Sequence, residues 1–154
     1  LGSLGIALGK EKKQPFFMKT YSGPESFESS CATDPARFAW YDSIKYGNTA
    51  FQNSVPSYRW SVESIHVTKA ILAPGAPEKI ASPVLLYTAE NDFSVLPEPQ
   101  KALIERVPHG EHRFVHGARH EIYRSVNDVL FPWWHEVITY FTERSALREK
   151  GENR

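Results

Sequence analysis

The sequence predicts an α/β fold whose carboxy-terminal half supplies two parallel strands and their helices, preceded by a mostly helical region. An apolar run at 84–88, opened by Pro83 and rich in β-branched and aromatic residues, is typical of a buried strand. A second strand pattern follows at 113–116, after a helical stretch, and strands that alternate with helices pair in parallel. Two strands alone leave both sheet edges open, so we interpret them as the last two strands of a larger parallel sheet.

The first half of the chain is expected to form helices joined by aromatic-rich loops. Residues 1–10 are an apolar segment that we interpret as the end of a helix. Ser, Gly, Pro and aromatic residues dominate 15–35 and indicate an ordered loop. Asp34 and Pro35 have the pattern of an N-cap and a proline in the first helical turn, which predicts a helix ending near Gly47.

The longest helix of this half is expected over 54–72. Its apolar side chains recur at helical spacing: Tyr58, Val62 and Ile65. The Ala, Pro and Gly residues of 73–77 end this helix and form the clearest internal boundary. We therefore divide the chain into a helical region, 1–74, and an α/β region, 75–154.

Two further helices belong to the α/β region. A short one is expected over 100–106, between the two strands. The final one is expected over about 127–147 and contains Pro132. Its adjacent Trp133 and Trp134 are both expected to pack on the sheet.

Composition excludes several classes of protein. A hydrophobic fraction of 41% in 154 residues indicates a folded globule. With 18 basic and 18 acidic residues there is no broad basic face for nucleic acid. The single cysteine, Cys31, excludes an internal disulfide and fits a reducing compartment. No apolar run approaches the length of a membrane span. The chain opens at Leu1 without a methionine, so we expect a truncated or processed start.

A carboxylate and a histidine follow the two predicted strands. Asp92 comes in the polar turn after the first strand, and His120 in the small-residue turn after the second. Parallel strands place their carboxyl ends side by side, so the two side chains are expected to meet. Asp92 would then fix the tautomer of His120 and stabilise its imidazolium, as the acid of a Ser-His-Asp triad does. Glu90, in the same turn, is the competing acid.

The remaining residues supply neither a nucleophile motif nor a metal site. No Gly-x-Ser-x-Gly turn occurs in the sequence, and Ser3, in Leu1-Gly2-Ser3-Leu4-Gly5, lacks the first glycine. His109, His112 and His116 are expected to face solvent, and their spacing fits no metal ligand set.

Three segments resemble the carboxy-terminal half of the α/β-hydrolase fold, and more narrowly the lysophospholipase L2 and monoacylglycerol lipase group. The segment PVLLYTAEND at 83–92 resembles that family's acid strand and turn, and GARHEI at 117–122 resembles its histidine turn. The segment PSYRWSVESI at 56–65 resembles the helix that closes its cap, and the resemblance as a whole covers roughly 30–142. The residues after the acid, SVLP at 94–97, lack the polar pair that the family often has.

The resemblance implies a serine hydrolase acting on a fatty-acyl glycerol ester, a lysophospholipid or monoacylglycerol, without metal or organic cofactor. Asp92 would be the acid and His120 the general base. Residues 1–74 would be the cap, and its acyl-binding aromatic residues would be Phe16, Phe17, Tyr58 and Trp60. The partner would be the missing amino-terminal half of the fold, with the nucleophile, or a second copy. We expect a cytoplasmic protein with peripheral contact at the inner face of the membrane.

Two alternatives remain open. In the first, the chain is a non-catalytic binding or assembly module that pairs its open sheet edge with another chain or with its own copy. In the second, the chain belongs to an α/β-hydrolase with a different chemistry, such as a thioesterase or a haloperoxidase.

Overall fold

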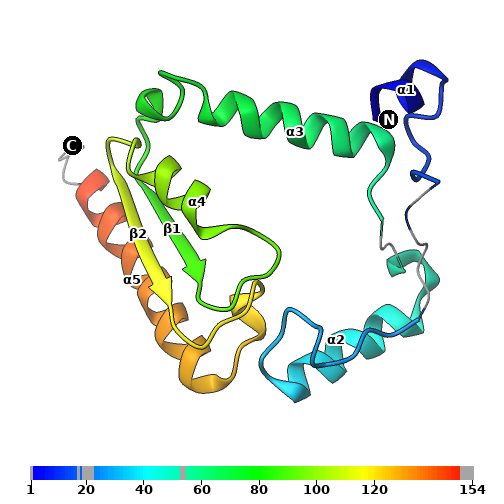
Figure 1. Ribbon diagram of the computed structural model, residues 1–154. Helices are drawn as coiled ribbons and strands as arrows, with labels where there is room; N and C mark the ends of the chain where they lie inside the picture. Colours follow the sequence, from blue (N-terminus) through cyan, green and yellow to red (C-terminus); the bar gives the residue numbers. More distant parts are fainter. Residues whose placement is uncertain (1, 17, 19–22, 53–54, 150–154) are drawn as a thin grey trace.

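The structure is a computed structural model that describes residues 2–16, 18, 23–52 and 55–149. The described residues form helices and a two-stranded parallel sheet, so the fold is mixed α/β (Figure 1). The main elements are α1 (Gly2–Ala7), α2 (Pro35–Gly47), α3 (Tyr58–Leu72), β1 (Val84–Ala89), α4 (Pro97–Ile104), β2 (Gly110–Val115) and α5 (Asn127–Glu149).

The helices of the first half begin where side chains cap them. The carboxylate of Asp34 accepts the backbone N–H of Arg37 at 2.8 Å, which confirms the predicted start of α2. Helix α3 begins four residues later than predicted, because Ser57 caps it by accepting the N–H of Trp60 at 3.2 Å.

Helix α1 packs against the start of α3 through a glycine. A Cβ atom on Gly5 would lie 2.6 Å from Cγ of the buried Tyr58, so the glycine lets the two helices approach closely. The predicted division at residue 74 falls at the end of α3 and remains a prediction.

Strands β1 and β2 pair in parallel, as the sequence predicts, with Tyr87 opposite Arg113 and Ala89 opposite Val115. Strand β2 begins three residues before its predicted start. A Cβ on Gly110 would lie 2.6 Å from the carbonyl oxygen of Ile104, so only glycine fits where the strand passes the end of α4.

One helix covers each face of the sheet. Helix α4 begins at Pro97, three residues before the predicted start, and its Gln100 receives a hydrogen bond from the buried Thr88 of β1 at 2.7 Å. His112 of β2 lies 2.8 Å from the same hydroxyl group, so the prediction that it faces solvent is wrong. Its side chain points to the α4 face, where Thr88 is its polar partner.

Helix α5 covers the opposite face. Ala89, Ala118 and Ile122 form a buried cluster against which Trp133 packs. Trp134 is 44% exposed, so its predicted packing on the sheet is wrong. Successive helical residues point about 100° apart, and adjacent tryptophans therefore cannot both face the strands.

Among the helices that the structure describes, none has the length and apolar character needed to cross a bilayer.

Candidate active site

Asp92 and His120 meet at the carboxyl ends of the two strands. Asp92 lies in the turn after β1, and His120 lies in the turn after β2. Parallel pairing brings the two turns together, and Nδ1 of His120 lies 2.8 Å from Oδ2 of Asp92. The structure therefore has the acid–histidine contact that the strand order predicts.

The carboxylate of Asp92 is held on both oxygens. Its Oδ1 accepts the backbone N–H groups of Ser94 at 2.8 Å and Val95 at 2.9 Å. Burial raises the pKa of Asp92, but the hydrogen bonds from His120 and from these two N–H groups lower it by more, so the net pKa lies below its usual value. Its side chain is only 5% exposed, and it is ionised at neutral pH.

This anchoring defines the tautomer of His120. An ionised carboxylate only accepts hydrogen bonds, so Nδ1 of His120 carries the proton that Asp92 binds. Nε2 is then the basic nitrogen. Within the described residues Nε2 has no hydrogen-bond partner, and the imidazole is 40% exposed. The ring is therefore oriented by Asp92, and Nε2 is its hydrogen-bond acceptor.

Glu90, the competing acid, holds the histidine turn instead. Its Oε2 accepts the backbone N–H of Gly117 at 2.8 Å, and its Oε1 lies 3.2 Å from Nδ1 of His116. These two hydrogen bonds lower the pKa of Glu90. Gly117 has φ 73°, a conformation that favours glycine. The carboxylate thus stabilises the sharp bend that leads to His120.

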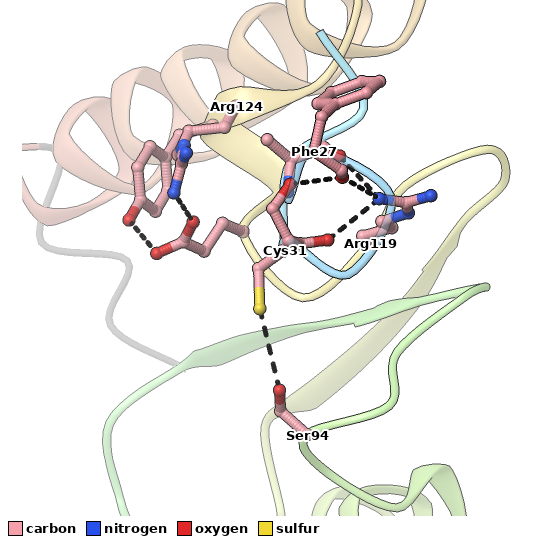
Figure 2. A network of polar contacts seen from close by, with 9 residues as sticks. Phe27, Cys31, Ser94, Arg119 and Arg124 are labelled. Carbon is pink, nitrogen blue, oxygen red and sulfur yellow. Dashed lines mark hydrogen bonds and ion pairs between the residues drawn. The ribbon is translucent and has the colours of Figure 1, made fainter. Parts of the chain in front are cut away.

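The residue before His120 anchors a loop from the helical region (Figure 2). Nη1 of Arg119 donates to three backbone carbonyl oxygens, those of Phe27 at 3.0 Å, Ser30 at 2.9 Å and Ala32 at 3.1 Å. We call the segment 27–32 the clamp loop.

The clamp loop also contacts both turns of the dyad. The residue after His120 donates its N–H to the clamp loop, from Glu121 to the carbonyl oxygen of Cys31 at 3.3 Å. Sγ of Cys31 lies 3.8 Å from Oγ of Ser94, whose backbone N–H binds Asp92 (Figure 2). Burial raises the pKa of the Cys31 thiol, which stays protonated at neutral pH. The clamp loop is therefore a direct link between the helical region and the dyad.

Arg124 joins the start of α2 to the same region. Its carbonyl oxygen accepts the N–H groups of Thr33 at 3.2 Å and Asp34 at 3.1 Å. Its buried guanidinium group bonds Glu121 and lies 4.2 Å from the ring centre of Tyr41 in α2. Sequence patterns did not single out Arg119 or Arg124, although each lies within four residues of His120 in the sequence.

The predicted acyl-binding residues lie elsewhere. The N–H of Phe16 donates to Oη of Tyr58 at 3.4 Å, and Tyr58 lines a cavity of about 340 Å³ between α1 and α3. Trp60 is 62% exposed on α3, and Phe17 lies outside the described residues. Figure 1 shows α1 and the start of α3 well separated from the carboxyl ends of the strands. Their acyl-binding role remains a prediction.

Over the described ranges, no group of three or more His, Cys, Asp and Glu side chains is arranged to hold a metal ion. No known protein-family profile matches the chain, and no curated protein matches it.

Proposed function

We propose that this chain carries the acid and the general base of a serine ester hydrolase of the lysophospholipase or monoacylglycerol lipase type. The observation that supports this most directly is the 2.8 Å contact between Nδ1 of His120 and a buried, ionised Asp92. The contact also differs from an ordinary surface ion pair, because two backbone N–H groups fix the second oxygen of the Asp92 carboxylate.

In this proposal His120 transfers protons and Asp92 orients it. Nε2 of His120 takes the proton from the attacking serine and later passes it to the glycerol oxygen that leaves. Asp92 stabilises the imidazolium that forms between these steps. The sequence contains no Gly-x-Ser-x-Gly turn, so the serine and the N–H groups that bind the oxyanion come from polypeptide outside these 154 residues.

The substrate class rests on the resemblance at 83–92 and 117–122, which points to a fatty-acyl glycerol ester. Exposed aromatic side chains in the helical region, such as Phe16 and Trp60, fit an apolar acyl chain or the surface of a membrane. A cytoplasmic protein in peripheral contact with the inner face of a membrane is the matching proposal for location.

The dyad is tested first in the chain of 154 residues. At neutral pH, ¹⁵N NMR of the histidine side chains should show His120 as the Nδ1–H tautomer. Asp92→Asn should change that tautomer, because an amide also offers donors to the ring. His109→Ala is the control, because its exposed side chain is in no contact with the dyad. An Nε2–H tautomer in the unsubstituted chain would contradict the proposed geometry.

Catalysis is tested in the natural polypeptide that contains these residues together with a serine nucleophile. Hydrolysis of monooleoylglycerol and of lysophosphatidylcholine should fall by about three orders of magnitude or more in His120→Ala. His109→Ala should keep the parent rate. Near-normal hydrolysis by His120→Ala would refute the assignment of the general base.

A further inference from the structure

The histidine turn is held from two sides, and His120 lies between them. On the side before His120, the turn after β1 makes the contacts. Asn91 donates its N–H to the carbonyl oxygen of Ala118 at 2.9 Å. Glu90 accepts the N–H of Gly117 at 2.8 Å. These bonds join the two turns directly, but they end two residues before His120, so the rest of the histidine turn needs another support.

The clamp loop supplies that support. Nη1 of Arg119 binds three carbonyl oxygens of the loop at distances between 2.9 and 3.1 Å. The N–H of Glu121 binds a fourth, that of Cys31, at 3.3 Å. The two residues that flank His120 in the chain are therefore tied to one segment. Among the described residues, Arg119 makes hydrogen bonds only with this loop, so it acts on His120 through the backbone.

The clamp loop is itself firmly held. Oγ of Ser30 donates to the carbonyl oxygen of Phe27 at 2.8 Å and accepts the N–H of Ala32 at 3.3 Å. Both Ser30 and Ala32 are fully buried. The ring of Phe27 packs against that of Phe38 in α2, with 5.5 Å between the ring centres. A segment fixed in this way can hold the residues on either side of His120 in place.

The three carbonyl oxygens that converge on Arg119 need a cation between them (Figure 2). Each oxygen is the negative end of a peptide dipole, and like charges that face one another at short range repel. Without the guanidinium group these oxygens would also lose their partner in a partly buried loop, which costs free energy. The clamp loop would then move away from the histidine turn, together with the carbonyl oxygen that binds Glu121.

The same loop reaches the turn that contains Asp92. Sγ of Cys31 lies 3.8 Å from Oγ of Ser94, and the N–H of Ser94 binds Oδ1 of Asp92 at 2.8 Å. The clamp loop thus contacts both turns of the dyad on their outer sides. The contact between the imidazole and the carboxylate is 2.8 Å long. An added separation of about 1 Å would take it beyond hydrogen-bonding distance.

We propose that Arg119 is a positioning residue of the dyad: through the clamp loop it holds the histidine turn where the imidazole of His120 meets the carboxylate of Asp92. The geometric part of this inference needs only the dyad itself. Its consequence for catalysis rests on the proposed function. Arg119 is not a catalytic residue in this arrangement, because its guanidinium group binds the clamp loop and not the reacting atoms.

The test is ¹⁵N NMR of the histidine side chains in the chain of 154 residues at neutral pH. In Arg119→Met, the ring shifts of His120 should move from those of the Nδ1–H tautomer toward those of His109, whose exposed side chain is an internal reference. Arg119→Lys should lie between the two, because an ammonium group can bind some of the same carbonyl oxygens. Gly5→Ala is the control for lost stability. Its methyl group meets Tyr58 in the helical region, so His120 should remain the Nδ1–H tautomer.

Two results would overturn the inference. Unchanged ring shifts of His120 in folded Arg119→Met would mean that the dyad does not depend on the clamp loop. An equal change in Gly5→Ala would mean that any loss of stability disturbs the dyad. If Arg119→Met does not fold, Arg119→Lys carries the test, and ring shifts equal to those of the parent chain would then overturn the inference.

Kinetics separate this inference from the proposed function. In the natural polypeptide that contains these residues and a serine nucleophile, Arg119→Met should lower kcat by about 10²-fold, the effect of misplacing a catalytic group by about 1 Å. KM should stay within about twofold, and Arg113→Met should keep the parent rate. A loss confined to KM would overturn the inference, because Arg119 would then act on substrate binding. If His120→Ala keeps its activity, the proposed function fails, while the NMR result for Arg119 stands.

Discussion

Replacing Arg119 by methionine should release the clamp loop from the histidine turn. Methionine keeps much of the length of the side chain but removes every donor. In the native protein Nη1 carries two hydrogens and serves three carbonyl oxygens, so it makes about two well-aligned charge-assisted bonds at a time. The carbonyl groups left behind belong to a segment in which Ser30 and Ala32 are fully buried.

The expected loss of stability follows from these contacts. A hydrogen bond with one charged partner contributes about 1.5–3 kcal/mol, and the half-buried guanidinium group of Arg119 favours the lower end of that range. For two bonds we expect the free energy of unfolding to fall by about 3 kcal/mol, or the melting temperature by roughly 6–12 °C in a chain of this size.

Urea unfolding with a matched arginine variant measures this effect. Arg113→Met also removes ion pairs, but Arg113 is 44% exposed, and surface pairs contribute about 0–1 kcal/mol. Arg119→Lys should restore part of the loss, because an ammonium group keeps the charge without the planar fork. The N–H of Glu121, bound to Cys31, should lose its exchange protection in Arg119→Met. Equal losses in the two methionine variants, with that protection unchanged, would refute the reasoning.

Two further predictions concern Asp92 and the glycine under Tyr58. Because the pKa of Asp92 is lowered in the folded protein, its stabilisation is complete above the ordinary aspartate value of about 3.9 and is lost as the pH falls through the lower folded value. Asp92→Asn should therefore lose less stability than the parent between pH 6 and pH 2 in urea titrations, and an identical pH dependence would contradict this. Gly5→Ala should cost about 1–3 kcal/mol by forcing a methyl group into Tyr58, measured by thermal unfolding. Gly47→Ala, whose Cβ meets nothing within 4 Å, should be neutral or stabilising and is the control.

The regular elements could be predicted because their signals are local. Neighbouring residues indicated the Asp34–Pro35 cap and the apolar run of β1. The alternation of strand and helix patterns along the sequence then indicated parallel pairing. The errors in the bounds have local causes as well, such as the cap at Ser57. The early start of β2 is different, since it depends on the close approach of Gly110 to Ile104, which are not neighbours in sequence.

The candidate site was predictable in part. Residue types and strand order indicated that a carboxylate would meet His120, but they left Glu90 and Asp92 as competitors. The structure separates the two, because Asp92 reaches the imidazole while Glu90 binds Gly117. Whether Asp92 and His120 catalyse remains a prediction, as do the roles of Phe16, Tyr58 and Trp60.

The sequence by itself determined the α/β order, the turn positions of Asp92 and His120, and the absence of a Gly-x-Ser-x-Gly turn, because these depend on residue type and spacing along one stretch. Only the tertiary structure decided that Arg119 holds the clamp loop and that Asp92, not Glu90, contacts His120. Both depend on segments far apart in the chain. Their contacts follow from how the helices and strands pack, and no local pattern of residues encodes that packing.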